Sequence, residues 1–426
     1  MKTMKSRFRN LLFLINLLAA IPLLAIGHAD IVVDAAGNGD VRTITEALMK
    51  VTTFSYPRVV IFVKNGVYAE KIRISQNYIT LRGESRDSTI IRFSQLRSDW
   101  DAKTDCIGPA VVNIHGDDVV LDNLTIENSQ LEIGPHAFAV YGKGTRTVIV
   151  NCNVLSKGAD TVSLWEYKNG MYYHANCRFE GAVDFVCPRG WCFIRDSQFY
   201  EVKATAALWH AGGYDPGQKL VIRNSDFDGV PGFQLGRHHY DAQFYLLDCR
   251  FSENMADQPI FRKIYPEDTL RNNPAYFSDR NYFYNSQKSG EPFEWLADNL
   301  HTAADSPSPE MITAAWTFAG KWDPENRAPI KVVAAEIRGT SLILTFDEIV
   351  SVRGTPVFEN AAGKPFRIFQ QRFLDINRLT FVSVEAILPD DLAGFMALVS
   401  GDIIASTAYI TERSIGASFA IPKVEQ

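Results

Sequence analysis

The chain has 426 residues, of which 43 are lysine or arginine and 49 are aspartate or glutamate, so its formal net charge is −6 at pH 7. An acidic chain without a basic stripe argues against nucleic acid as a partner and against strong attraction to a polyanion. We therefore expect a largely neutralised substrate or a locally basic site. The length suits one large domain plus a small one.

Residues 1–29 have the pattern of an export signal. Four basic residues precede the apolar run Leu11–Ile26, and Gly27-His28-Ala29 supplies the small residues that a signal peptidase reads. The alternative is an uncleaved membrane anchor, but the run is short for a spanning helix and is interrupted by Asn16 and Pro22. We expect a secreted or periplasmic protein that is not embedded in a membrane.

The segment 31–55 predicts a strand, a glycine-rich turn and then a helix. Thr43-Ile44-Thr45-Glu46 fits a capping box. A helix here would cover the open end of a repeat structure, which otherwise exposes unpaired backbone. Residues 59–74 predict two strands around Asn65-Gly66, a pair that favours a hairpin turn. The polar insertion Arg97–Gly108 predicts a loop beside the substrate site.

Five segments then repeat one pattern, a short strand around a small residue followed by a polar turn. The small residues follow one another at intervals of 25, 20, 28 and 24 positions and are Cys152, Cys177, Ser197, Ser225 and Cys249. Self-similarity at such a period is the signature of a stacked solenoid in which each repeat forms one coil. Most segments end in phenylalanine, as strands that pack against the coils above and below would.

Two aspartates occur in this repeat at nearly the same phase. Asp160 lies eight residues after Cys152, and Asp184 lies seven residues after Cys177. Because adjacent strands lie roughly 4.8 Å apart, the two carboxylates should be neighbours on one face. Close carboxylates cannot both ionise freely, which separates them into an acid and a base or nucleophile. The alternative is that each aspartate only fills or caps a turn.

All six cysteines precede residue 250. Export permits disulfides, but Cys152, Cys177 and Cys249 share the inward repeat position and are expected to be small buried core residues. Cys187 and Cys192 are the pair we expect if one disulfide forms. The cysteine and histidine spacings do not suggest a metal site, and we expect no cofactor.

Several motifs occur in order along residues 31–324. Gly66, Tyr68 and Glu70 form a Gly-x-Tyr-x-Glu segment, and LTIENS, GADTVSL, GAVDFVCPRG and LGRHH follow. Together with the opening VVDAAGNGDVRTITEAL, they resemble the pectin methylesterases, carbohydrate esterases that demethylate pectin on a right-handed parallel β-helix. The resemblance implies an all-β solenoid with an N-terminal capping helix and a pectin-like polysaccharide as substrate.

The resemblance also implies roles for three residues. Asp184 would be the nucleophile that attacks the methyl ester, and Asp160 the general acid and then the base that activates water. Arg237 would keep Asp184 ionised and oriented, because a nearby arginine lowers the pKa of one carboxyl while the other stays raised. No metal is implied. From the residues alone, Arg237 would be taken for a surface arginine.

The chain departs from the family pattern at the two glutamines that the family places near the tetrahedral intermediate. His136 stands at the first position and Ala159 at the second. Alanine cannot donate a hydrogen bond from its side chain, and losing one oxyanion donor costs roughly 10²–10³ in rate in other enzymes. His136 could donate instead, or could simply lie beside the site.

The aromatic residues around the site differ as well. The family's Pro-Trp after the arginine is His238-His239 here. His239 or Tyr240 could replace the tryptophan as a platform for a sugar ring. Trp165, Trp209, Tyr172 and Tyr173 could also stack on sugar, and each is equally compatible with packing. We expect a divergent esterase with shifted substrate preference or reduced activity on pectin.

The pattern changes after the repeats. Trp295, Trp316 and Trp322 are expected to pack against the solenoid, and Asn326–Ile330 is a plausible linker. From Lys331 onward, short alternating strands separated by turns predict an immunoglobulin-like β-sandwich. We therefore divide the chain into a signal at 1–29, a β-helix domain at 30–326 and a sandwich at 327–426, and we expect a monomer.

Three further functions compete with a pectin methyl esterase. A pectate-lyase type would need a Ca²⁺-binding cluster of acids plus a basic residue, and the set of Asp160, Asp184 and Arg237 lacks the third acid. A non-catalytic glycan-binding protein is credible because both glutamines are replaced. A thioesterase on the same fold is the weakest alternative.

Overall fold

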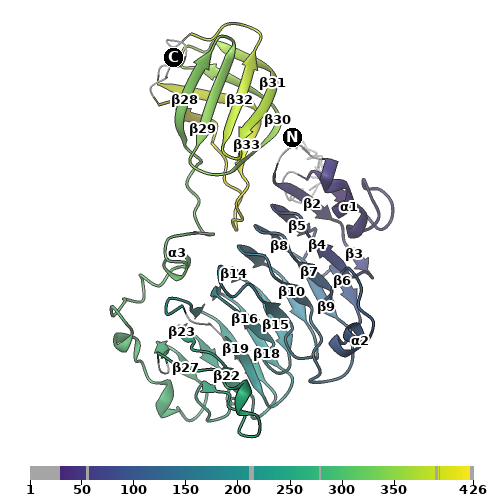
Figure 1. The fold of residues 1–426 in the computed structure, drawn as a ribbon, viewed down its shortest axis with the longest axis vertical. Helices are drawn as coiled ribbons and strands as arrows, with labels where there is room; N and C mark the ends of the chain where they lie inside the picture. The colour runs from purple at the N-terminus through teal and green to yellow at the C-terminus, as the bar shows by residue number, and fades with distance from the viewer. Residues whose placement is uncertain are drawn as a thin grey trace, which may run out of the picture.

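The computed structural model describes residues 29–53, 57–210, 215–277, 280–388, 392 and 394–422. The predicted export signal lies outside the described residues except for Ala29. Three parallel sheets stack their strands along one axis, and Figure 1 shows the coils side by side, with the C-terminal strands beyond the N-terminal end of the stack. This arrangement confirms the predicted parallel β-helix.

In the described chain, each complete coil contributes one strand to each sheet, and the incomplete coils at the ends account for the different strand numbers. The ten-stranded sheet contains β1 (Ile31–Val33), β2 (Val59–Val63), β5 (Ile79–Gly83), β8 (Val120–Asp122), β11 (Thr147–Val150), β14 (Met171–Ala175), β17 (Trp191–Arg195), β20 (Leu220–Arg223), β23 (Gln243–Leu247) and β26 (Arg280–Tyr284). The nine-stranded sheet contains β3 (Gly66–Tyr68), β6 (Thr89–Phe93), β9 (Thr125–Asn128), β12 (Asn153–Leu155), β15 (Arg178–Gly181), β18 (Gln198–Glu201), β21 (Asp226–Gly229), β24 (Arg250–Phe251) and β27 (Gln287–Lys288). The eight-stranded sheet contains β4 (Ile72–Ile74), β7 (Val112–Ile114), β10 (Val140–Gly142), β13 (Val162–Leu164), β16 (Val186–Pro188), β19 (Ala206–Trp209), β22 (Gln234–His238) and β25 (Phe261–Arg262).

The repeated phenylalanines form a ladder inside the helix. Phe179, Phe199, Phe227 and Phe251 occupy the same register position on successive strands of the nine-stranded sheet. Their neighbouring ring centroids lie 5.4, 4.3 and 5.2 Å apart. Side chains of one kind therefore stack from coil to coil and bury a continuous core, as the sequence period predicted.

The repeated small residues join neighbouring coils. Ser197 Oγ donates to Arg195 O at 2.8 Å and accepts from Cys177 N at 3.2 Å, and Cys177 Sγ lies 3.3 Å from Ala175 O. All six cysteines are free. The predicted Cys187–Cys192 disulfide is therefore wrong, because Cys187 lies in the eight-stranded sheet while Cys192 lies in the ten-stranded sheet.

A short helix covers the first coil, as predicted. In α1 (Ile44–Lys50), the Thr43 side chain and Glu46 form the predicted capping box. Glu70 adds a second cap, because its carboxylate accepts from the backbone N–H groups of Ile44 at 2.8 Å and Thr45 at 3.0 Å. The acidic residue of the Gly-x-Tyr-x-Glu segment therefore anchors this helix.

The predicted hairpin at Asn65-Gly66 is wrong. Strand β2 ends before this pair and β3 begins at Gly66, but the two strands belong to different sheets. Strand β2 pairs with β1 and β5, and β3 pairs with β6, all in parallel. In a β-helix, a short polar turn bends the chain from one sheet to the next instead of reversing it.

The segment after β27 returns along the outside of the helix, where Figure 1 shows it leading to α3 (Ala314–Thr317). It covers the outer face of the ten-stranded sheet. Trp322 is buried, the Trp316 ring lies 5.3 Å from that of Tyr245, and the Trp295 ring lies 5.8 Å from that of Phe283. These tryptophans pack against the helix, as predicted.

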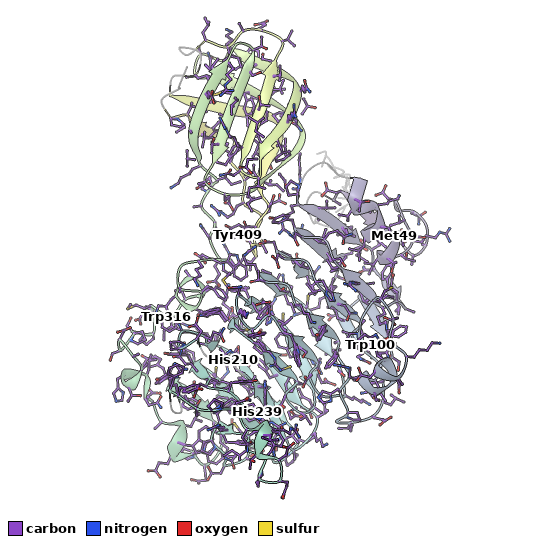
Figure 2. The ribbon with its side chains drawn as sticks, viewed as in Figure 1. Met49, Trp100, His210, His239, Trp316 and Tyr409 are labelled. Carbon is purple, nitrogen blue, oxygen red and sulfur yellow. The ribbon has the colours of Figure 1, made fainter. Side chains whose placement is uncertain are left out.

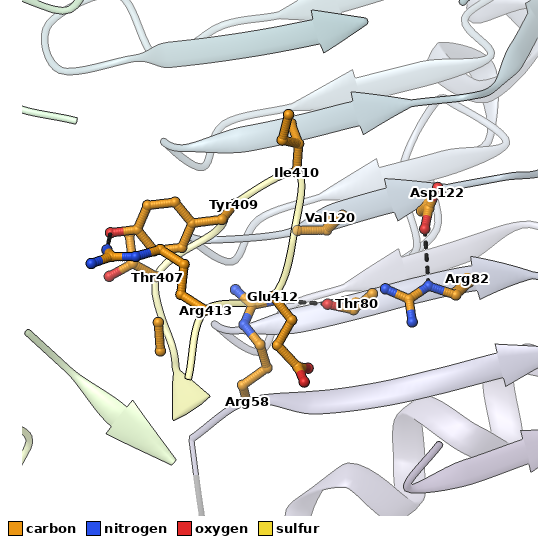
Figure 3. Close-up of a pocket in the computed structure, with 11 residues that line it drawn as sticks. Arg58, Thr80, Arg82, Val120, Asp122, Thr407, Tyr409, Ile410, Glu412 and Arg413 are labelled. Atoms are coloured by element: carbon orange, nitrogen blue, oxygen red, sulfur yellow. Dashed lines mark hydrogen bonds and ion pairs between the residues drawn. The ribbon is translucent and has the colours of Figure 1, made fainter. Parts of the chain in front are cut away.

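The C-terminal strands pair antiparallel around a core of their own. This confirms a separate antiparallel β-structure after the helix, where the sequence predicted an immunoglobulin-like sandwich. The strands are β28 (Val332–Arg338), β29 (Ser341–Phe346), β30 (Val350–Asn360), β31 (Pro365–Asp375), β32 (Arg378–Ser383), β33 (Phe395–Ala405) and β34 (Ser418–Ala420). A chain segment after β33 contacts the helix, and Figure 3 shows its residues Tyr409 and Arg413 near Arg58. No helix in the described residues is long and apolar enough to span a bilayer.

Candidate active site

Asp160 and Asp184 lie on corresponding turns of successive coils. Each precedes a strand of the eight-stranded sheet by two residues, and the pairing of Val162 with Val186 aligns the two turns. Asp160 N donates to Val183 O at 3.2 Å, so the backbones are direct neighbours. Both aspartates have left-handed backbone, with φ of 58° and 57°, which aspartate tolerates better than most residues.

Arg237 on β22 reaches the second aspartate from two coils further on. Its Nε donates to Asp184 Oδ1 at 2.9 Å, and its Nη2 donates to Asp184 Oδ2 at 2.7 Å. This is a two-pronged pair with a fixed orientation. Asp184 is only 8% exposed, so its carboxylate is held in place with little help from water.

Burial dominates the electrostatics of this pair. Burial raises the pKa of Asp160 to about 6, against the opposing effects of Cys187 and Arg189. Burial also raises the pKa of Asp184 to about 6, although Arg237 opposes it. The expectation that Arg237 would lower the pKa of Asp184 below its usual value is therefore wrong, because desolvation outweighs the arginine. Arg237 opposes the effect of burial on Asp184 and thereby favours its ionised form.

Asp160 contacts uncharged groups instead of an arginine. Ser163 Oγ lies 3.4 Å from Asp160 Oδ2, and the same hydroxyl accepts from Trp165 Nε1 at 2.6 Å. Cys187 Sγ lies 3.3 Å from Ser163 Oγ. The sequence reasoning missed Ser163 and Cys187. The signal was available, because both residues lie three positions after an aspartate and face each other across β13 and β16.

His136 lies beside Asp160, with its Nε2 3.9 Å from Asp160 Oδ1. Its backbone forms a bridge with Ala159, so the two residues that replace the family's glutamines are adjacent. The His136 side chain is 59% exposed, whereas Ala159 is buried. Partial burial, together with the charge of Arg97, lowers the pKa of His136, which favours a neutral imidazole at pH 7.

The predicted loop beside the site contains a short helix, α2 (Arg97–Ala102). Arg97 N donates to His136 O at 2.8 Å, and the Arg97 guanidinium lies 5.9 Å from the centre of the Phe138 ring. The insertion therefore supports the segment that presents His136.

The predicted sugar platforms divide into two groups. Trp165 is half exposed next to Asp160, and the Arg189 guanidinium lies 3.8 Å from its ring centre. Trp209 lies 5.6 Å from Arg237 and 5.7 Å from the His239 ring, which contacts Tyr240 edge-on. Figure 2 shows His239 far from Tyr409, so this end of the site is remote from the C-terminal sheet. Tyr172 and Tyr173, by contrast, are fully buried and cannot stack on a sugar.

Cations gather around the pair in this otherwise acidic chain. Arg189 directly follows β16, and Arg237 lies on β22 two coils further on. Both lower the pKa of Asp160, and Arg237 also lowers that of Asp184, in each case against the effect of burial. The described residues contain no cluster of three or more histidine, cysteine, aspartate or glutamate side chains that could hold a metal ion.

Residues 30–209 match the family profile described as Pectinesterase. Among curated proteins, the chain is 28% identical over 159 residues to "Pectinesterase 31" of Arabidopsis thaliana, covering 35% of this chain and 49% of that protein. It is also 28% identical over 179 residues to "Pectinesterase/pectinesterase inhibitor U1" of Solanum lycopersicum, covering 40% of this chain and 28% of that protein. The chain thus aligns with half or less of the length of these relatives.

Solved structures show the same fold. The chain matches "Pectin methylesterase PemA from Erwinia chrysanthemi" with a TM-score of 0.56 at 20% identity, covering 70% of this chain and 98% of that one. It matches "Pectin methylesterase from Carrot" with a TM-score of 0.53 at 20% identity, covering 69% and 94%. A pectin methylesterase "in complex with hexasaccharide VII" matches with a TM-score of 0.55 at 20% identity, covering 70% and 99%.

Proposed function

We propose, from the premise that residues 30–209 form a domain of the pectinesterase family, that the protein hydrolyses methyl esters of a pectin-like polysaccharide. The products would be methanol and free carboxylates on the polymer. One observation carries this proposal. Arg237 donates two hydrogen bonds to Asp184, while Asp160 on the adjacent coil has the uncharged Ser163 hydroxyl as its side-chain neighbour at 3.4 Å. Two carboxyls in such different surroundings suit two different roles.

The reaction would proceed in two steps. Ionised Asp184 attacks the ester carbonyl carbon, and the methoxy oxygen leaves as methanol after taking the proton of Asp160. The resulting acyl–enzyme anhydride is then hydrolysed by a water molecule, which gives its proton back to Asp160. The hydroxyl of this water adds to the sugar acyl carbon, and Asp184 leaves as a carboxylate, so both carboxyls are restored. The new carboxylic acid on the sugar then ionises and releases the second proton of the water to solvent.

His136 is the proposed donor to the oxyanion that forms in each step. A neutral imidazole can donate from one ring nitrogen, and His136 Nε2 already lies within 3.9 Å of Asp160. Ala159 offers no side-chain donor at the other position. We therefore expect slower turnover than a site with two glutamines would support.

The test is methanol release from highly methylated pectin by wild type, Asp184→Asn and Asp160→Asn. Both variants should lose more than about 10³-fold in kcat, because each removes a reacting group. Asp226→Asn is the matched control, since Asp226 forms a similar two-pronged pair with Arg250 but lies exposed on the nine-stranded sheet. Retained activity in Asp184→Asn would refute the mechanism.

A non-catalytic glycan-binding protein is the second candidate, and Ala159 favours it. Wild type that binds a pectin fragment but releases no methanol would identify this function. For either candidate, we propose that the protein is exported and acts outside the cytoplasm as a monomer, without a cofactor or metal.

A further inference from the structure

Glu201 is a fully buried carboxyl directly behind the proposed nucleophile, and the mechanism above does not use it. It is the last residue of β18 and is 0% exposed. Its register neighbours on the adjacent coils are Gly181 and Gly229, so neither neighbour brings a side chain into its space. Burying a carboxyl this completely is costly unless it is neutral or well paired.

The Glu201 carboxyl holds the turn that follows it. Oε1 accepts from Lys203 N at 3.0 Å, and Oε2 has no hydrogen-bond partner among the described residues. Burial raises the pKa of Glu201 to about 9, and the nearby charge of Asp184 adds to this effect. Asp184 is the charged residue that contributes to this raised pKa, and the register neighbours Gly181 and Gly229 have no side-chain charge. Complete burial thus favours the neutral form of the Glu201 carboxyl.

The 202–206 turn, which Glu201 holds, supports the backbone of the proposed nucleophile Asp184. Thr205 Oγ1 accepts from Val183 N at 3.2 Å, and Ala206 O accepts from Asp184 N at 2.6 Å. These two contacts fix the backbone N–H groups of both residues that place the Asp184 carboxylate. Residues 202–206 thus form a supporting turn that lies between Glu201 and Asp184.

The backbone at Val183 and Asp184 needs the support of this turn. Val183 has φ of 43° and Asp184 has φ of 57°, so two successive residues are left-handed. A β-branched residue such as valine is a true outlier there, and such strain persists only where surrounding contacts enforce it. Without the supporting 202–206 turn, the left-handed backbone at Val183 and Asp184 would relax, and the Asp184 carboxylate would move relative to Asp160.

We propose that Glu201 is a positioning residue that holds the 202–206 turn and thereby fixes the Asp184 carboxylate for attack. The proposal rests on the proposed function. Glu201 touches no substrate, because it is fully buried. Its neutrality also keeps a second negative charge away from Asp184, whose single ionic partner among the described residues is Arg237.

Two substitutions separate positioning from simple filling of space. Glu201→Gln keeps a neutral acceptor of the same shape, whereas Glu201→Leu fills a similar volume but cannot accept from Lys203 N. We expect Glu201→Gln to stay within about three-fold of wild type in kcat. We expect Glu201→Leu to lose roughly 10- to 100-fold in kcat with little change in KM, because a misplaced group slows chemistry more than binding. Glu180→Leu, on the neighbouring strand with a partly exposed carboxylate paired to Arg178, is the control.

Folded Glu201→Leu with wild-type kcat would overturn the proposal, and so would equal losses in the Gln and Leu variants. If wild type releases no methanol at all, the proposed function fails, but a second measurement still decides the role of Glu201. Infrared spectra at neutral pH should contain the band of a protonated carboxylic acid that Glu201→Gln lacks. Amide exchange at Val183 and Asp184 should be at least about ten-fold faster in Glu201→Leu. Absence of either effect would overturn the proposal.

Discussion

The two carboxyls differ in what touches them, and this difference is the basis of their proposed roles. Asp184 receives two hydrogen bonds from Arg237, whereas Asp160 lies 3.4 Å from the Ser163 hydroxyl. Burial raises the pKa of both to about 6. They are coupled, so their protons leave in two steps that belong to the pair.

We therefore expect kcat/KM to follow a bell-shaped pH profile centred near pH 6. Below the centre, both carboxyls are protonated and no nucleophile is present; above it, both are ionised and no acid remains. Arg237→Lys should move the acidic limb to higher pH, because a lysine cannot supply the two-pronged pair that favours ionised Asp184. A profile of the variant identical to that of wild type would contradict this assignment. The measurement is initial methanol release between pH 4 and pH 9.

His136 gives a second prediction at this scale. Glutamine at position 136 restores the family's donor, whereas alanine removes it. We expect His136→Gln to match or exceed wild type and His136→Ala to lose about 10- to 100-fold in kcat, less than for a buried donor because His136 is largely exposed. His301→Ala, an exposed histidine on the returning segment, is the control. Unchanged kcat in His136→Ala would show that this residue makes no catalytic hydrogen bond.

Sequence alone predicted the two aspartates but not their surroundings. The repeat phase placed Asp160 next to Asp184, because one strand per coil leaves little freedom in register. It could not place Arg237, which comes from two coils beyond Asp184, and only the family resemblance suggested it. It also missed Glu201, since an acidic residue at the end of a short strand suggests a solvent-exposed side chain. The glycines at its register neighbours, Gly181 and Gly229, are visible only once the coils are aligned.

At the scale of elements, the phenylalanine ladder should carry much of the helix's stability. Phe199 is buried, and its ring stacks nearly parallel on Phe227 at 4.3 Å. Phe199→Ala should destabilise the protein by about 3–5 kcal/mol, because the cavity cannot be closed without shifting whole coils. Tyr200→Ala on the same strand, whose side chain points outward and is exposed, should cost much less. Urea denaturation followed by tryptophan fluorescence measures both, and similar losses would contradict the ladder's importance.

The elements also show where local signals mislead. Asn65-Gly66 favours a hairpin in isolation, but the β-helix uses the same short turn to pass between sheets. The spacing of Cys187 and Cys192 permits a disulfide loop, but the two residues belong to different sheets. In both cases, parallel pairing with neighbouring coils overrides the local preference. The prediction made from the five repeated small residues was confirmed, because it rested on the repeat period and not on a local preference.

At the scale of the whole molecule, a buried arginine joins the C-terminal part of the chain to the helix, together with contacts such as the hydrogen bond from Ala408 N to Asp118 Oδ1 at 3.0 Å. Arg58 is 4% exposed and donates to Ser406 O from two nitrogens, at 2.8 and 2.6 Å. It also donates to Thr80 Oγ1 at 2.7 Å and Asp118 O at 2.7 Å, which belong to the helix. Arg58 thus joins both parts in one hydrogen-bond network, part of which Figure 3 shows.

We expect Arg58→Met to destabilise the protein by about 3–5 kcal/mol, because it leaves several buried acceptors without a donor. Arg82→Met is the matched control, since Arg82 lies nearby in Figure 3 but pairs with Asp122 near the surface. Thermal unfolding measures both losses. Methanol release per folded molecule should stay unchanged in Arg58→Met, because the site around His239 lies far from Tyr409 at the junction. Lost activity in a folded Arg58→Met variant would mean that the C-terminal sheet acts on the site. Equal losses of stability in Arg58→Met and Arg82→Met would mean that the junction contributes no more than an ordinary surface ion pair.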